Sequence, residues 1–123
     1  MTRTKVNATE SLEIMEEHGD QDSVLHLRGR LNIDSSPDLR DRLLATLRGK
    51  SPKAVIVDLT DVTYIDSSGI ATLVEGLKIA CKQQTTLRLQ GLQGRLLHLF
   101  QVTGVLTLFE SGLANSSTAS KVS

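Results

Sequence analysis

The segment Asp66-Ser67-Ser68-Gly69 is the clearest candidate for chemistry in this chain of 123 residues. It lies between an apolar run that predicts a strand and an apolar stripe that predicts a helix. The free N–H groups and the positive dipole end of a helix N-terminus favour an anion, including a phosphate carried on a hydroxyl. Asp66 or a serine can also cap such a helix, and Gly69 lets another chain approach closely. The alternative interpretation is purely structural: these residues form a good helix N-cap, and one of the two serines is redundant.

A serine here is not a nucleophile by itself. Nucleophilic serine needs an adjacent base and an oxyanion site, and the sequence shows no base for it. His18, His26 and His98 stand alone along the chain, so each is predicted to be structural or exposed. The motifs of P-loop, dinucleotide, zinc-protease, dithiol and hydrolase sites are absent. We therefore expect no catalytic residue, no metal and no cofactor.

Composition argues against several other classes of function. The chain has 14 basic and 14 acidic residues, which leaves no net charge for nonspecific nucleic-acid binding or polybasic membrane attachment. No apolar run approaches the ~20 residues of a spanning helix. Residues 1–10 lack the apolar centre of a signal peptide. We expect a cytoplasmic protein without direct nucleic-acid contact or membrane insertion.

Two strands and a helix are predicted before the serine segment. Residues 11–17 and 23–28 alternate between apolar and polar, and the Gly19-Asp20 step between them predicts a hairpin. Ser36 is predicted as the N-cap of the following helix, with Pro37 at its first position.

Strands and helices continue to alternate along the rest of the chain. Residues 54–59 form a continuous apolar run, which predicts a strand covered on both faces. Residues 85–90 and 105–109 predict two further strands, separated by an amphipathic helix over residues 92–100. One face of the helix after the serine segment is predicted from five spaced residues, Ile70, Leu73, Val74, Leu77 and Cys81.

The predicted order ββαβαβαβ indicates an α/β fold with a mixed sheet that is mostly parallel in its later part. One domain is expected over residues 11–110, because domains cluster near ~100–150 residues. Residues 1–10 are predicted to be a flexible N-terminus. Residues 111–123 are polar and serine-rich, which predicts a disordered tail.

The run of residues 55–80 closely resembles the signature of STAS domains, specifically of anti-sigma factor antagonists. The matching pieces are the apolar strand at residues 55–57, the pair Tyr64-Ile65, and Asp66-Ser67-Ser68-Gly69-Ile70 opening a helix. Residues 25–32 and 95–105 are similar to the family's earlier strand and loop and to its last helix and turn. The resemblance extends over about residues 10–110.

This resemblance implies a mixed sheet of four to five strands with helices packed on one side. It also implies a binding protein that is not an enzyme. In the family, a partner that is both an anti-sigma factor and a serine kinase with an ATPase fold phosphorylates the first serine after the aspartate, here Ser67. A serine phosphatase resets it. The unphosphorylated form binds the partner and frees a sigma factor.

The resemblance also implies roles for the neighbours of Ser67. Ser68 would cap the helix or act as a minor acceptor. Asp66 would orient the loop or the attack on the kinase's nucleotide, and Gly69 would permit close approach. Loops at one end of an α/β sheet lie together, which places a rim of partner-binding residues beside the phosphosite. This rim comprises Gly29, Asn32, Asp34, Ser35 and Ser36. Asn32 and Arg30 stand where the family usually has Asp and Glu, so the rim is less acidic than usual.

Two alternatives remain at this point. The first keeps the fold and makes the chain an accessory STAS subunit of a membrane transporter for lipids or anions. Retention of Ser67 and Ser68 favours the phosphorylation switch over this reading, because the transporter versions often lose the phosphoacceptor. The second alternative is a serine hydrolase or nucleotidase, which the lack of a base and of a phosphate loop disfavours.

Overall fold

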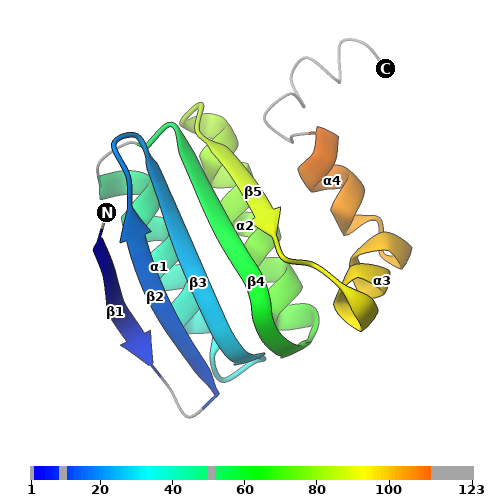
Figure 1. Ribbon diagram of the computed structural model, residues 1–123. Coiled ribbons are helices and arrows are strands. Elements are labelled where there is room, and N and C mark those ends of the chain that lie inside the picture. Colours follow the sequence, from blue (N-terminus) through cyan, green and yellow to red (C-terminus); the bar gives the residue numbers. More distant parts are fainter. Residues whose placement is uncertain (1, 9–10, 50–51, 112–123) are drawn as a thin grey trace.

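The computed structural model shows one five-stranded sheet with helices against one face and one edge (Figure 1). It describes residues 2–8, 11–49 and 52–111, with residues 2–8 and 111 described by their backbone alone. The strands are β1 (Thr2–Ala8), β2 (Leu12–His18), β3 (Asp22–Leu31), β4 (Ala54–Ile65) and β5 (Thr86–Gln90). The helices are α1 (Ser36–Gly49), α2 (Ser67–Lys82), α3 (Gly94–Val102) and α4 (Val105–Ser111).

The strands lie side by side in sequence order, and the sheet changes from antiparallel to parallel pairing at β3. The pairs β1–β2 and β2–β3 are antiparallel, whereas β3–β4 and β4–β5 are parallel. Parallel neighbours need crossover connections, which α1 and α2 supply on the same face of the sheet (Figure 1). The predicted hairpin is confirmed, because the Gly19 N–H donates to the carbonyl oxygen of Asp22 at 2.8 Å.

The core lies between the sheet and the two crossover helices. The alternate residues of β2, β3 and β4 that are buried toward α1 and α2 are mostly apolar, with Glu16 and Ser23 as polar exceptions. The buried apolar side chains of these elements include Leu12, Ile14, Leu25, Leu27, Leu39, Leu43, Leu47, Val55, Val57, Leu73 and Leu77. The prediction that residues 54–59 are covered on both faces is wrong. Ile56 and Asp58 are half-buried on the opposite face, where the described chain places no helix (Figure 1).

The start of α1 differs from its prediction by one residue. Ser36 is the first residue of the helix and not its N-cap, and the Asp38 and Leu39 N–H groups donate to the carbonyl oxygen of Ser35. The Ser36 hydroxyl is instead used by the preceding loop, where it donates to the carbonyl oxygen of Asn32 at 2.7 Å.

The end of the described chain also differs from its prediction. Residues 105–109 are predicted as a strand, but they lie in α4. Gly104, at a φ of 78°, turns the chain between α3 and α4. Val105 and Phe109 are both buried, and a spacing of four residues suits one helix face as well as one strand face. The short apolar run therefore did not distinguish the two structures.

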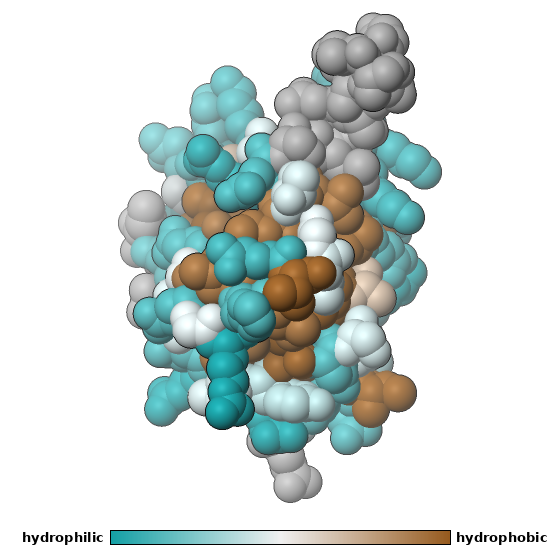
Figure 2. Space-filling view, turned by 90° about the vertical axis from the view of Figure 1, so that its right-hand side faces the viewer, coloured by the Kyte–Doolittle hydropathy of each residue, from teal (hydrophilic) through white to brown (hydrophobic). Residues whose placement is uncertain are grey.

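Helices α3 and α4 lie beside β5, and apolar side chains gather on this flank of the molecule (Figures 1 and 2). Leu96, Leu99 and Leu106 are partly buried against the core, whereas Val102 is 65% exposed. Within the described ranges, no helix is both long enough and apolar enough to cross a bilayer.

Strand β1 corrects the prediction of a flexible N-terminus over residues 1–10. The backbone of residues 2–8 pairs with β2, with one register irregularity between Lys5 and Asn7. An open strand edge offers N–H and C=O groups to an extended segment, so a polar sequence can join it without apolar alternation. The predicted tail over residues 111–123 lies outside the described residues, apart from Ser111 at the end of α4.

Gly29 provides a test of the bend in β3. It adopts a φ of 112°, and a Cβ at this position would overlap the carbonyl oxygen of Ser11. We predict that Gly29→Ala lowers the free energy of unfolding by about 2 kcal/mol or more, through backbone strain and overlap. Gly49→Ala is the control, because nothing lies within 4 Å of the added Cβ. Chemical denaturation compares the two variants, and equal small losses would contradict the prediction.

Candidate functional site

Ser67 is the first residue of α2, at the end of β4 where the chain leaves the sheet. Its side chain is exposed, and its hydroxyl makes no hydrogen bond to the residues that the structure describes. A helix begins here because Asp66 takes the extended N-cap conformation, with φ −114° and ψ −174°. The predicted phosphoacceptor is therefore a free hydroxyl at a helix N-terminus.

Asp66 uses its carboxylate to cap α2. Its Oδ1 atom accepts from the Ser68 N–H at 3.0 Å and from the Gly69 N–H at 3.2 Å, and the Ser68 hydroxyl donates to the same atom. That hydroxyl is the main reason why the pKa of Asp66 is below its usual value. The N–H groups of Gly69, Ser68 and Ile33 lower the pKa further, while desolvation opposes the shift. The carboxylate is thus engaged by the fold and makes no hydrogen bond to Ser67.

The two serines of the segment have different environments. Ser68 is half-buried, and its Oγ atom lies 3.1 Å from the Oγ atom of Ser36 in addition to donating to Asp66. Ser67 has neither contact. The helix cap predicted for Ser68 is instead Asp66, and the Ser68 hydroxyl supports this cap by donating to its carboxylate. Ser67 is the serine whose side chain is exposed.

Gly69 corrects one prediction. It is buried, and a Cβ there would lie 2.7 Å from Cγ of Leu31 and 2.8 Å from Cγ1 of Ile65. The close approach that this glycine permits is therefore made by the ends of β3 and β4. It brings α2 down onto the sheet and does not open a surface for another chain.

The loop between β3 and α1 lies beside Asp66 and Ser67. The Asp66 N–H donates to the carbonyl oxygen of Leu31 at 3.1 Å, which joins the ends of the two parallel strands. The Asn32 side chain accepts from the N–H groups of Asp34 and Ser35 at 3.0 and 3.1 Å. The Ser35 hydroxyl donates to the carbonyl oxygen of Arg30 at 2.8 Å. This side-chain bonding gives the loop one defined shape against Asp66.

The predicted rim is only partly at the surface. Asp34 is exposed and Asn32 is half-buried, so these two can face a partner. Ser35 and Ser36 are buried, 0% and 5% exposed, and their hydroxyls hold the loop. Gly29 serves the bend in β3. Ser35 and Ser36 are thus structural supports of the rim, because the loop needs their hydroxyls for internal hydrogen bonds. Gly29 is also structural, because of its φ of 112°.

Three exposed residues lie close to Ser67, and of these only Arg30 was expected at the surface from the sequence. Ile33 lies in the loop between β3 and α1, and its side chain is 72% exposed. The backbone N–H of Ile33 hydrogen-bonds to the Asp66 carboxylate. Tyr64 is 40% exposed at the end of β4, and the Arg30 guanidinium lies 4.4 Å from the centre of its ring. We call Arg30, Ile33 and Tyr64 the flanking patch. An isolated apolar residue in a polar loop was the signal that could have identified Ile33.

The histidines lie away from this site. The prediction that His26 stands alone is wrong, since its ring lies between Glu17 and Asp58 on the open face of the sheet. Cross-strand neighbours come from distant parts of the sequence, so linear spacing could not reveal them. In the described parts of the chain, no group of three or more acidic, histidine or cysteine side chains is arranged to hold a metal ion.

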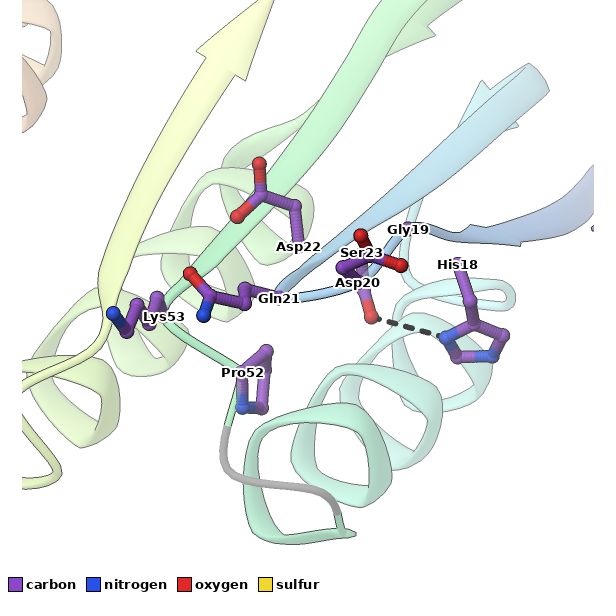
Figure 3. A pocket seen from close by; sticks show the side chains of 8 residues that line it. All are labelled: His18, Gly19, Asp20, Gln21, Asp22, Ser23, Pro52 and Lys53. Atoms are coloured by element: carbon purple, nitrogen blue, oxygen red, sulfur yellow. Dashed lines mark hydrogen bonds between the residues drawn. The ribbon is translucent and has the colours of Figure 1, made fainter. Parts of the chain in front are cut away.

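His18 lines a separate hollow at the opposite end of the sheet (Figure 3). Its Nδ1 atom lies 3.1 Å from the Ser23 hydroxyl and its Nε2 atom 3.0 Å from Glu16. Lys53 and two aspartates complete a lining of mixed charge. Lys53 precedes β4 and Ser67 follows it, so this hollow is no part of the phosphosite.

The cap makes the pKa of Asp66 a direct test of the site. We predict that Ser68→Ala raises this pKa toward the ordinary carboxyl value, because it removes the main stabilising donor. Ser67→Ala is the matched control and should leave the pKa unchanged. Since the folded pKa is lowered, the stability contributed by the cap is present above about pH 3.9 and is lost as the pH falls through the folded value. Carbon-13 NMR titration of the carboxyl measures both variants, and equal shifts would refute this assignment.

The sequence matches a known domain family over most of its length. Residues 14–110 match the profile of the family described as "Mlab, STAS domain". An anti-sigma-B factor antagonist of Bacillus subtilis is 30% identical over 91 residues, which cover 74% of this chain and 82% of that protein. An anti-sigma-B factor antagonist of Listeria monocytogenes is 31% identical over 100 residues, which cover 81% of this chain and 86% of that protein.

Solved structures with the same fold include an anti-sigma factor antagonist from Mycobacterium paratuberculosis, with a TM-score of 0.70 and 23% identity over 85% of this chain and 87% of that one. A sulfate transporter family protein from Wolinella succinogenes has a TM-score of 0.63 and 23% identity, over 76% of this chain and 75% of that one. At these identities the likeness concerns the fold alone. The profile and the curated relatives show that the chain belongs to the STAS domain family, and these relatives are anti-sigma factor antagonists.

Proposed function

We propose that this protein is an anti-sigma factor antagonist that is switched by phosphorylation of Ser67. Its partner is an anti-sigma factor that is also a serine kinase with an ATPase fold, and a serine phosphatase reverses the modification. The unphosphorylated form binds the partner in the cytoplasm and releases a sigma factor. The observation that carries this proposal is the exposed, unbonded Ser67 hydroxyl beside a Ser68 hydroxyl that the fold already uses.

The chemistry of phosphorylation assigns the catalytic groups to the partner. The Ser67 oxygen attacks the γ-phosphorus of ATP, the bond from that phosphorus to the β–γ bridging oxygen breaks, and the hydroxyl proton passes to a base. Asp66 is committed to the cap, and no other described side chain hydrogen-bonds to Ser67. The partner therefore supplies the base as well as the nucleotide. The same observation disfavours a serine hydrolase or nucleotidase, which needs its own base.

Phosphate at Ser67 is compatible with the fold. It adds about −1.5 to −2 charges at neutral pH, and the first turn of α2 contains no acidic side chain. The Asp66 carboxylate already uses the N–H groups of Ser68 and Gly69, so the helix dipole is what favours a negative charge at this end of α2. The domain therefore keeps its structure when it is modified.

Phosphate at Ser67 is not compatible with close contact by a partner. Ile33 and Tyr64 of the flanking patch offer apolar surface beside the serine. A partner that covers this surface must remove water from it, and a doubly charged group resists that desolvation. When the partner carries acidic groups, Asp66, Asp34 and the phosphate all repel them, which weakens binding further. Modification thus separates the two proteins without unfolding either.

A transporter-associated role is the second candidate. Its support is the fold that this chain shares with a sulfate transporter family protein. In that role the flanking patch would hold a transporter subunit, and binding would not depend on a phosphate. Affinity capture with this chain distinguishes the two, because the bound protein is either an ATPase-fold kinase or a transporter subunit.

Modification in the native cells tests the acceptor directly. We predict that intact-mass spectrometry of the purified protein shows one added phosphate under some growth or stress conditions. Ser67→Ala should abolish it, whereas Ser68→Ala, the matched control, should retain it. Phosphate on Ser68 instead, or none under any condition, would contradict the proposed switch and favour a constitutive binding module.

Charge at Ser67 should decide partner binding. We predict that Ser67→Asp weakens binding to the partner kinase at least about tenfold relative to Ser67→Asn, which has the same shape without the charge. Isothermal calorimetry with the purified kinase measures both variants. Equal affinities would show that charge at this position does not control the complex.

The flanking patch gives an independent prediction. Ile33→Ser should weaken the complex about tenfold, as expected for an apolar anchor at the centre of an interface. Its free energy of unfolding should hardly change, because the side chain is 72% exposed. Val102→Ser is the matched control, since Val102 is 65% exposed at the end of α3 and is not part of the flanking patch. Equal losses of affinity in both variants would remove the patch from the interface.

A further inference from the structure

Arg30 is held against an aromatic ring at the end of the sheet where the chain leads to Ser67. The central carbon of its guanidinium lies 4.4 Å from the centre of the Tyr64 ring. The two residues are paired in the register of β3 and β4, one residue before each strand ends, and both side chains are exposed. The Arg30 backbone is fixed as well, because its N–H donates to the carbonyl oxygen of Ser11 and its carbonyl oxygen accepts from the Ser35 hydroxyl.

The N–H donors of this guanidinium are not used by the described residues. Two other arginines lie against a carboxylate. Arg40 binds Glu75 through two nitrogens at 2.8 to 3.1 Å, and Arg42 lies 3.3 Å from Glu16. In the described ranges, no acidic side chain is within ion-pair distance of Arg30, and its side chain donates no hydrogen bond. Stacking on a ring occupies a face of the planar group, so the N–H edge remains for a group from another molecule.

The charged groups of the neighbouring elements leave this position available. On the loop, the helix cap and the adjacent strands they are Asp34, Asp66, Glu13, Arg28, Asp61 and Lys5. In the strand register, the glutamate of β2 and the aspartate of β4 are both opposite Arg28, and the lysine of β1 is opposite Met15, further along β2. Asp66 uses its carboxylate in the cap. Asp34, exposed in the loop after β3, is therefore the one like charge that an incoming anion meets there among these groups.

A single guanidinium beside apolar groups suits the acidic side chain of a protein. Arginine binds a carboxylate through two parallel N–H bonds, and Ile33 and Tyr64 add exposed apolar surface for the residues next to it. A polyanion such as a nucleic acid needs many cations, whereas this chain has no net charge. Arginine and tyrosine are also among the residue types that most often supply the binding energy of protein interfaces.

We propose that Arg30 binds an acidic side chain of the partner protein and that Tyr64 positions the guanidinium for this contact. The inference rests on the proposed function and adds the chemistry of the partner surface, which is a carboxylate next to apolar residues. Phosphate at Ser67 brings about −1.5 to −2 charges. It repels the same carboxylate and offsets the positive charge of Arg30. The contact thus gives the phosphorylation switch a specific ion pair to disrupt.

The charge at position 30 tests the proposal by isothermal calorimetry of the intact chain with the purified partner kinase. Arg30→Gln should weaken binding at least about tenfold, and Arg30→Glu should weaken it further, because the partner carboxylate then meets a like charge. Arg30→Lys should lie between the wild type and Arg30→Gln, since it keeps the charge without the paired donors. Arg95→Glu is the matched control and should bind as the wild type does, because Arg95 is exposed at the start of α3, outside the flanking patch.

Salt dependence and stability separate an ion pair from a folding defect. Between about 50 mM and about 500 mM NaCl, the wild type should lose more affinity than Arg30→Gln, because screening weakens only the charged contact. The free energy of unfolding of Arg30→Gln should hardly change, since the side chain is exposed. Tyr64→Leu should weaken binding more in the wild type than in the Arg30→Gln background. Equal losses in the two backgrounds would exclude the positioning role of Tyr64.

The Ser67 variants in the same assay distinguish two kinds of failure. If Ser67→Asp weakens binding but Arg30→Gln does not, or if Arg30→Glu binds more tightly than the wild type, the ion pair is wrong and the switch stands. If the kinase does not bind, or if Ser67→Asp binds as tightly as Ser67→Asn, the proposed function fails and this inference fails with it.

Discussion

The parallel pairing of β3 and β4 is the constraint on which the rest of the structure depends. It directs the carboxyl ends of both strands to one edge, where the Asp66 N–H meets the Leu31 carbonyl oxygen. Because parallel strands need a crossover connection, the chain between β3 and β4 must also pass over one face of the sheet, where it forms α1. Two segments more than thirty residues apart, the loop after β3 and the start of α2, therefore meet and share the Asp66 carboxylate.

Adjacent residues of the site have different structural roles. Asp66, Ser68 and Gly69 face inward and fix the first turn of α2 against the strand ends, while Ser67 faces outward and contributes nothing to that packing. A modification can then change the charge of the surface without a structural cost, because the modified atom is not part of the hydrogen-bond network. Under the proposed function a partner binds the exposed patch formed by Arg30, Ile33 and Tyr64, and the charge change weakens that binding.

Local patterns predicted the elements around the site well, because each one is encoded within a few residues. The stripe of apolar residues after Gly69 located α2, and the Gly19-Asp20 step located the hairpin. Failures arose where the structure depends on partners distant in sequence. The polar residues of β1 are held by backbone pairing, and the neighbours of His26 come from two other strands. The buried positions of Ser35 and Ser36 likewise depend on loop closure, which residue types alone do not reveal.

The contact between Ser36 and Ser68 has a consequence for how such a domain diverges over evolutionary time. Substitution of Ser68 disturbs both the helix cap and the neighbouring loop, so drift at this position is restrained by folding itself. Ser67 makes no such contact with the described residues, so under the proposed function only recognition by a partner preserves it. A descendant copy that no longer meets a kinase can lose Ser67 first while its architecture persists. In such lineages the second serine would remain as a relic of the fold, whereas the first would record whether the switch is still in use.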